Sequence, residues 1–148
     1  MENHSAHIER TYDAPAERVF DAWTSAEVVR RWWRALHHFE VSDAEVDPRV
    51  GGVIRVVMHD PRKQLDHGGG GTYTEVDRPN RLAFTWVWDN DPEGRRTLIE
   101  IDFSERASRT TVSFSHTLLF SAEMARDHEE GWSGVLDELG AYLATTGS

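Results

Sequence analysis

Four polar side chains fall at positions that the sequence pattern places inside the fold: Tyr73, Glu75, His116 and His128. Residues of a strand alternate between the two faces of a sheet, and we expect Tyr73 and Glu75 to face inward from a strand at 72–76. A carboxylate paired with an imidazole is typical of general acid–base catalysis, here on a ligand carbonyl or enol. The same groups would also orient the polar end of an apolar ligand, or hydrogen-bond one another and only specify the core. These three interpretations stay open.

Large apolar side chains accompany these four on the same predicted inner surface. Six tryptophans are many for 148 residues, and a buried indole needs a partner for its N–H, so we expect a roomy, aromatic-lined interior. The predicted ligand-binding residues are Trp33, Met58, Tyr73, Glu75, Phe84, Trp86, Trp88, Phe114, His116, His128 and Trp132. We assign no catalytic residue, and Glu75, His116 and His128 are the candidates for such a role.

Histidines and carboxylates also gather at three places along the chain: His4 with His7, His37 with His38, and 59–60 with 66–67. None of these groups has the ligand spacing of a structural zinc site, and the first lies near a chain end, where adventitious metal binding is common. No nucleophile elbow or Ser–His–Asp arrangement is visible. We therefore predict no metal and no cofactor.

Four consecutive glycines, Gly68–Gly71, form a second unusual segment. They are not a phosphate-binding loop, because no Lys-Ser/Thr pair follows and no helix begins there. We expect this segment to be a mobile connector between two strands, placed to gate a pocket.

The elements that position these residues begin with one long helix over 121–145. Its apolar residues recur at helical spacing and form a single stripe that contains His128 and Trp132. Ser121 is the expected N-cap. Gly131 leaves a gap beside Trp132 on the stripe. Such a helix needs a broad apolar surface to lie on, and the preceding strands are predicted to supply it.

Turn signals recur about every 8–14 residues between alternating segments, which is typical of an antiparallel meander. The predicted strands are 7–13, 39–46, 53–59, 72–76, 81–88, 97–103 and 109–116. One short helix begins after Asp13, its expected cap, and buries Val19, Phe20 and Trp23, and a second restarts after Ser25. The predicted fold class is α+β: a curved antiparallel sheet, in chain order β-α-α-β6-α, wrapped around the long C-terminal helix with an internal cavity.

Arg30, Arg31 and Arg34 flank Trp32 and Trp33 in the second short helix. We expect these guanidinium groups to rest on indole faces at the surface, and the alternative is an anion site. Either arrangement places a basic, aromatic patch on an acidic protein.

Several segments together resemble one known family: the run IERTYDAPAERVFDAWTSAEVVRRWW at 8–33, the glycine pair 51–52, GTYTEV at 71–76, RLAFTW at 81–86, and HEEGW at 128–132 followed by Leu136 and Leu139. It is the bacterial family named for its similarity to the C-terminal domain of the activator of the 90-kDa heat-shock-protein ATPase, within the START / Bet v 1-like helix-grip superfamily. The resemblance covers about residues 5–144. It implies a deep cavity between sheet and helix, used for lipids, polyketides, hormones and other apolar ligands, and sometimes for cyclase, aromatase or hydrolase chemistry.

Composition narrows the function classes further. The chain has 148 residues, 16 basic against 26 acidic side chains, a formal net charge of −10 and no cysteine. Such an acidic protein gains little from phosphate neutralisation, so nucleic acid and anionic membranes are poor partners. No segment has an apolar signal-peptide core or about 18 consecutive apolar residues. We expect a single cytoplasmic START / Bet v 1-like domain over 1–148, with its core at about 5–145, as a monomer or weak homodimer.

The leading hypothesis is the binding of a small apolar or aromatic ligand in the cavity between the sheet and the C-terminal helix. One alternative is a small-molecule enzyme, cyclase-, aromatase- or hydrolase-like, that uses an inward Glu/His pair. The other is a protein-interaction or co-chaperone-like module whose partner docks on the sheet or around Arg30, Arg31 and Arg34.

Overall fold

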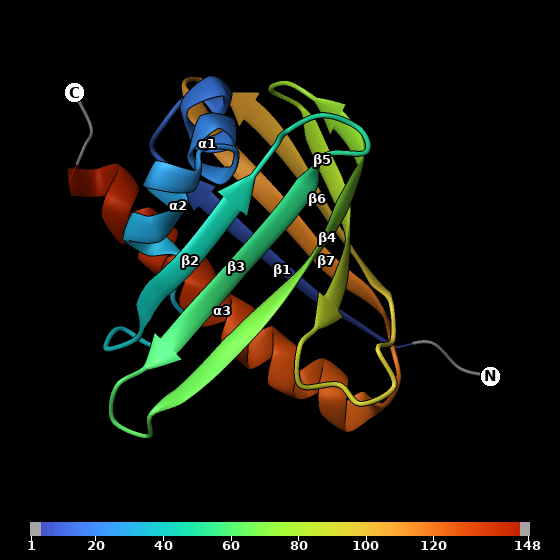
Figure 1. Cartoon of the computed structure of the whole chain (residues 1–148). Coiled ribbons are helices and arrows are strands. Elements are labelled where there is room, and N and C mark those ends of the chain that lie inside the picture. The colour runs from blue at the N-terminus through green and yellow to red at the C-terminus, as the bar shows by residue number, and fades with distance from the viewer. Residues whose placement is uncertain (1–3, 146–148) are drawn as a thin grey trace.

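The computed structural model describes residues 4–145, in which one seven-stranded antiparallel sheet curves around a long helix (Figure 1). The strand order is β1-β7-β6-β5-β4-β3-β2, so each strand from β2 to β7 pairs with its neighbour in sequence and β1 joins at the β7 edge. The elements are β1 (His4–Tyr12), α1 (Ala16–Trp23), α2 (Ala26–Trp32), β2 (Glu40–Val46), β3 (Val53–Asp60), β4 (Leu65–Asp77), β5 (Arg81–Trp88), β6 (Thr97–Arg106), β7 (Arg109–Leu119) and α3 (Ala122–Thr145). The predicted α+β class and chain order are confirmed.

Helix α3 crosses one face of the sheet, and the short helices α1 and α2 lie near its C-terminal half (Figure 1). The helix begins as expected, because Ser121 Oγ accepts the backbone N–H of Met124 at 3.0 Å. Its buried side chains are Trp132, Val135, Leu136, Leu139 and Leu143. They face the inner residues of β5, β6 and β7, and the two sets together make the main core.

Alternation along the central strands predicted the inner face correctly. Apart from the half-buried Trp88, the inward side chains of β5 to β7 are at most 4% exposed: Leu82, Phe84, Trp86, Thr97, Ile99, Ile101, Phe103, Val112, Phe114 and His116. β3 repeats the pattern with Ile54, Val56 and Met58. Period-two alternation is informative here because one face packs on the core and the other meets solvent.

The expected cap of α1 is wrong. Pro15, not Asp13, occupies the N-cap and offers no side-chain hydrogen bond. The backbone N–H of Ala16 donates instead to Oε1 of Glu105, 2.8 Å away on β6. A tertiary contact thus satisfies a helix terminus that local sequence rules assign to a neighbouring residue.

The predicted surface position of Trp32 and Trp33 is also wrong, because both are buried, at 0% and 1% exposed. The Trp32 indole N–H donates to the carbonyl of Ala22 at 3.0 Å, and its ring meets Trp23 edge-on with centroids 4.8 Å apart. The flanking arginines face carboxylates instead of indoles. Arg30, Arg31 and Arg34 pair with Asp43 at 3.8 Å, Glu27 at 3.4 Å and Glu138 at 2.7 Å respectively.

The glycine segment is not a connector between strands, which corrects our expectation. Gly68–Gly71 lies inside β4, paired with β3 on one side and β5 on the other. A Cβ on Gly69 would lie 2.6 Å from the Trp86 ring, and a Cβ on Gly71 would lie 2.1 Å from the carbonyl oxygen of Thr85. These glycines let a strand and a buried indole approach closely. The mobility of the segment remains a prediction.

Candidate functional site

Aromatic side chains occupy the space between the sheet and α3. Trp33, at the C-terminal end of α2, stacks on Trp86 of β5 with ring centroids 5.8 Å apart. The same ring meets Trp132 of α3 edge-on at 5.5 Å and Trp23 of α1 at 5.3 Å. Phe114 of β7 packs against Trp132 at 4.8 Å. We call these five side chains the aromatic cluster, and they are the candidate ligand site.

Sequence reasoning placed most of the predicted residues correctly. The inner surface contains every predicted ligand-binding residue except Glu75: Trp33, Met58, Tyr73, Phe84, Trp86, Trp88, Phe114, His116, His128 and Trp132. Trp88 and His128 are half-buried at one end, and the others are buried. Whether these residues bind a ligand remains a prediction.

Glu75 lies on the outer face of the sheet, contrary to the sequence prediction. A β-bulge between Tyr73 and Glu75 inserts one extra residue opposite the step from Phe84 to Ala83, and this reverses the facing of the residues that follow. The Glu75 carboxylate is about half exposed and accepts a hydrogen bond from Nε of Arg81 at 2.9 Å. The inward Glu/His pair required by the acid–base hypothesis is therefore absent.

His116 is part of a continuous series of hydrogen bonds that runs from Trp132 to the backbone of Trp86. The indole N–H of Trp132 donates to its Nδ1 at 3.0 Å, so in the neutral ring Nε2 carries the proton. That Nε2–H donates to Oγ1 of Thr97 at 2.7 Å, and Thr97 in turn donates to the backbone carbonyl of Trp86 at 2.7 Å. Both ring nitrogens of His116 are occupied, which leaves no lone pair to accept a proton from a substrate.

His128 repeats this arrangement one helical turn from Trp132. Trp88 Nε1–H donates to His128 Nε2 at 2.9 Å, and His128 Nδ1–H donates to the carbonyl of Met124 at 2.8 Å. The two imidazole rings lie 4.9 Å apart, edge to face. Each histidine is thus held as a neutral tautomer by a tryptophan.

Burial favours the uncharged form of both histidines. It lowers the pKa of His116 to about 3, with a smaller contribution from the nearby His128. Burial also lowers the pKa of His128, while its bond to the Met124 carbonyl opposes the change. A general base works best with a pKa near the operating pH, so His116 does not suit that role.

Four buried donors have no partner within residues 4–145: the indole N–H groups of Trp23 and Trp86, the hydroxyl of Tyr73, and Nε of Arg34, a side chain whose Nη2 pairs with Glu138. The rings of Tyr73 and Trp86 both contact Phe84, with Tyr73–Phe84 and Phe84–Trp86 ring centroids 5.6 and 6.1 Å apart. Burial raises the pKa of Tyr73, so this hydroxyl stays protonated. A buried donor without an acceptor costs about 1–3 kcal/mol, so these groups call for an explanation.

The sequence matches the model of one protein family over residues 13–144, and its description is Activator of Hsp90 ATPase homolog 1-like protein. The chain belongs to this family. No protein with a curated description is significantly similar to it. The family matches the resemblance noted from the sequence, and it lies within the Bet v 1-like helix-grip superfamily.

Solved structures share the family fold over nearly their whole length. An AHSA1 protein from Silicibacter pomeroyi is 26% identical, with 96% of this chain and 99% of that chain covered and a TM-score of 0.82. An AHSA1-like protein from Aeromonas hydrophila is 25% identical, with 97% and 94% covered and a TM-score of 0.80. A protein from Chromobacterium violaceum is 23% identical, with 93% and 94% covered and a TM-score of 0.84, and shows the fold alone.

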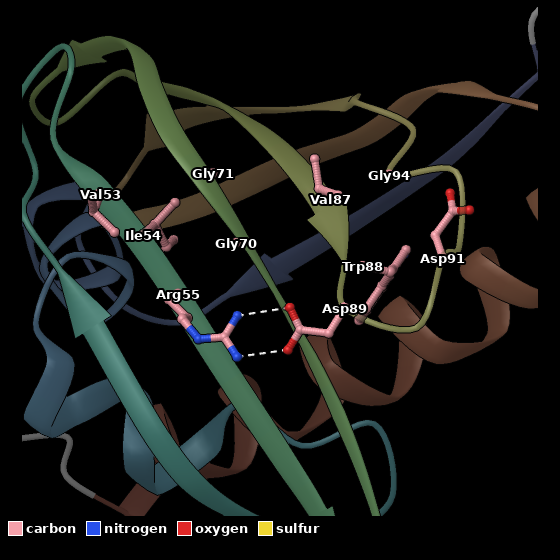
Figure 2. Close-up of a pocket in the computed structure, with 10 residues that line it drawn as sticks. All are labelled: Val53, Ile54, Arg55, Gly70, Gly71, Val87, Trp88, Asp89, Asp91 and Gly94. Carbon is pink, nitrogen blue, oxygen red and sulfur yellow. Dashed lines mark hydrogen bonds and ion pairs between the residues drawn. The ribbon is translucent and has the colours of Figure 1, made fainter.

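Two hollows of this AHSA1-like domain lie away from the aromatic cluster. One, of about 390 Å³, lies along β3, β4 and β5 between Val53, Val87 and the ion pair of Arg55 with Asp89, whose two contacts measure 2.9 and 2.6 Å (Figure 2). The other, of about 410 Å³, lies between the end of β1 and the C-terminal half of α3. Neither is enclosed between the sheet and α3, where the family resemblance implied a cavity.

Sequence reasoning missed two contributors to the candidate site. Trp23 was predicted to be buried, but nothing in the sequence indicates that its ring contacts Trp33 or that its N–H lacks a partner. Thr97 begins a predicted strand, but its bond to His116 depends on the pairing of β6 with β7. Within residues 4–145, no three His, Cys, Asp or Glu side chains gather as metal ligands, and no helix is long and apolar enough to cross a bilayer.

Proposed function

We propose that this AHSA1-like domain binds a small apolar or aromatic ligand between the sheet and α3. The observation that carries the proposal is the pair of unpartnered donors on the inner face, the Trp86 indole N–H and the Tyr73 hydroxyl, each on a residue 1% exposed. Buried polar groups in native proteins are nearly always hydrogen-bonded, and an acceptor on a ligand would supply the missing partner. The surrounding aromatic rings would supply the apolar contact.

The aromatic side chains touch one another, so a ligand enters by taking the place of a side chain. Trp33 is the candidate to move, because it follows the last residue of the seven-residue helix α2, outside a regular element. The backbone after it is weakly held at one point, where the N–H of Ala35 meets only the thioether of Met58, at 3.4 Å. Sulfur is a weak acceptor, which lowers the cost of shifting this segment.

The other two hypotheses lack comparable support. The enzyme hypothesis required an inward carboxylate, and Glu75 lies outside while His116 and His128 have both nitrogens bonded. The interaction-module hypothesis relied on a basic patch at Arg30, Arg31 and Arg34. Each of these arginines faces a carboxylate, so the patch is neutralised.

A neutral fluorescent probe, N-phenyl-1-naphthylamine, tests the proposal. Its emission rises in an apolar site, and we expect saturable binding of one probe per chain, checked by native mass spectrometry. The variant Trp86→Leu removes one wall of the aromatic cluster and should weaken binding about ten-fold or more. The control Val53→Lys places a charge at the rim of the outer hollow, on an already exposed side chain, and should leave binding unchanged.

Two results would contradict the proposal. If folded wild-type protein shows no saturable enhancement and no adduct, the interior is a filled core. If Val53→Lys abolishes binding while Trp86→Leu does not, the probe occupies the outer hollow shown in Figure 2.

A further inference from the structure

Arg34, which follows Trp33, has a buried Nε without a partner in the described part of the chain, but its charge is already paired with Glu138 at 2.7 Å. The interior beside the aromatic cluster therefore offers no unpaired counter-ion to a charged ligand. The buried polar residues within 4–145 are Asp60, Thr97, Thr110 and His116. The Asp60 carboxylate is already satisfied by the backbone N–H groups of Arg62 and Lys63, at 3.0 and 3.3 Å, and by His38 at 3.3 Å. The two threonine hydroxyls donate to backbone carbonyls, each at 2.7 Å. A ligand carboxylate or ammonium placed here would be desolvated without compensation.

The groups left without partners are donors. An indole N–H can only donate, so Trp23 and Trp86 require an acceptor, and the Tyr73 hydroxyl can donate as well. The histidines cannot compete for these donors, because both nitrogens of each ring are already bonded. The interior therefore complements a ligand that carries acceptor oxygens and no charge.

The contacts of the Trp33 ring indicate the shape of a ligand that could take its place. The Trp33 ring contacts those of both Trp23 and Trp86, the two indoles whose N–H groups are unpartnered. The stacking on Trp86 is close to parallel, with an angle of 18° between the ring planes. A planar two-ring molecule that replaces the Trp33 indole would keep this stacking and would lie beside both donors.

We propose that the ligand is an uncharged, planar two-ring molecule that bears a carbonyl or ether oxygen, and that this oxygen accepts a hydrogen bond from Trp86 or Tyr73. The inference rests on the proposed function and names the chemical class for the same site. It excludes fatty acids, phosphorylated metabolites and positively charged amines as preferred ligands.

Three probes of matched size separate these properties: 2-acetylnaphthalene, 2-isopropylnaphthalene and 2-naphthoate. They share the ring system and differ in a neutral acceptor, no acceptor, and a negative charge. Titration against displaced N-phenyl-1-naphthylamine should rank the ketone about five- to ten-fold tighter than the hydrocarbon, the value of one hydrogen bond. The naphthoate should bind at least about 100-fold more weakly than the ketone, because it has no counter-ion.

Two variants identify the donor. Tyr73→Phe removes only the hydroxyl, and Trp86→Phe removes the indole N–H. We compare the ratio of the ketone and hydrocarbon affinities, because a change in packing alters both probes alike. At least one variant should reduce this ratio to about one. The control Tyr12→Phe, on a hydroxyl that donates to the Leu136 carbonyl at 2.8 Å, should leave the ratio unchanged.

The failures of the two proposals are distinguishable. If the hydrocarbon binds as tightly as the ketone, or the naphthoate binds best, the ligand class is wrong while binding between sheet and helix stands. If both variants keep the ketone preference, the assigned donors are wrong. If none of the probes displaces the fluorophore and the fluorophore itself does not bind, the proposed function fails with it.

Discussion

Arg34 is bound to Glu138 through a contact of 2.7 Å between Nη2 and Oε1, which ties the segment after α2 to the middle of α3. The same carboxylate lies 3.1 Å from His37 Nδ1. Close by, Gly134 lets the chain approach α3, since a Cβ there would lie 2.1 Å from the carbonyl oxygen of Ala35. The segment that follows Trp33 is therefore held against α3 by one carboxylate, that of Glu138.

Weakening the contacts of Glu138 with Arg34 and His37 should make it easier for a ligand to displace Trp33. We expect Glu138→Gln to raise the association rate of N-phenyl-1-naphthylamine several-fold in stopped-flow fluorescence, because loss of the charge loosens Arg34 and His37 together. The control Glu27→Gln removes a pair with Arg31 within α2 and should leave the rate unchanged. Equal rates in all three proteins would show that this segment does not control entry.

The two tyrosines of the core give a prediction about stability alone. Tyr12→Phe should lower the free energy of unfolding by about 1–2 kcal/mol, because it removes the hydroxyl that donates to the Leu136 carbonyl. Tyr73→Phe should change it by less than about 0.5 kcal/mol or raise it, because its buried hydroxyl has no partner. Urea unfolding measures both, and equal losses would mean that the Tyr73 hydroxyl is satisfied in solution.

Two glycines should respond in opposite directions to the same change. Gly131→Ala should raise the stability by about 0.5–1 kcal/mol, because a Cβ on this helical residue meets nothing within 4 Å. Gly69→Ala should lower it by about 2 kcal/mol or more, because its Cβ would overlap the Trp86 ring. Thermal unfolding of the two variants checks the pair, and a stable Gly69→Ala protein would contradict the close packing of β4 on Trp86.

His116 makes stability depend on pH. Its pKa is lowered to about 3 in the folded protein against about 6.5 when unfolded, so the unfolded chain binds the proton first. The contribution is complete above about pH 6.5 and is lost as the pH falls toward 3, with about 2 kcal/mol lost by pH 5. His116→Gln should be less stable at pH 7 and should flatten this part of the profile, whereas the exposed His7→Gln should retain it. An unchanged profile in His116→Gln would exclude His116 as the group responsible.

Glu75 separates the acid–base hypothesis from the binding hypothesis. Glu75→Gln should keep both the fold and probe binding, because the side chain is half exposed and Arg81 retains Glu100 and Asp102 as partners. A large loss of probe affinity, measured by the same fluorescence titration, would place Glu75 near the ligand and contradict the outward position.

The sequence predicted the fold well because its signals are local or periodic. Alternation in β5 placed Phe84 and Trp86 inward, and helical spacing placed Trp132 on the buried side of α3. Glu75 was misplaced because a single bulge reverses the facing of every residue after it in the strand. The alternation of apolar and polar residues does not show where a bulge occurs. Trp33 was partly misjudged because three flanking arginines suggested a surface, and only tertiary pairing shows that they face carboxylates.

The chemistry of the candidate site was the least predictable part. Nothing near His116 in sequence shows that Trp132 occupies its Nδ1 and Thr97 its Nε2, since these partners lie on different elements. The missing partners of Trp86 and Tyr73 are likewise a property of the packed interior. Hydrogen-bond satisfaction depends on three-dimensional neighbours, and here it shows that both histidines are bonded within the protein instead of forming an acid–base pair with Glu75.

The central claim is that an unpartnered buried donor, the Trp86 indole N–H or the Tyr73 hydroxyl, receives a ligand oxygen, and two-dimensional ¹H–¹⁵N NMR of the six tryptophan side chains, with Tyr73→Phe beside it, tests this most directly. Spectra are compared between complexes with 2-acetylnaphthalene and 2-isopropylnaphthalene, so that ring-current effects cancel. We predict a downfield difference at Trp86, or a ketone preference lost in Tyr73→Phe, and little change at Trp32, Trp88 and Trp132, whose N–H groups already donate. Identical indole spectra in the two saturated complexes, together with a ketone preference that survives Tyr73→Phe, would contradict the claim.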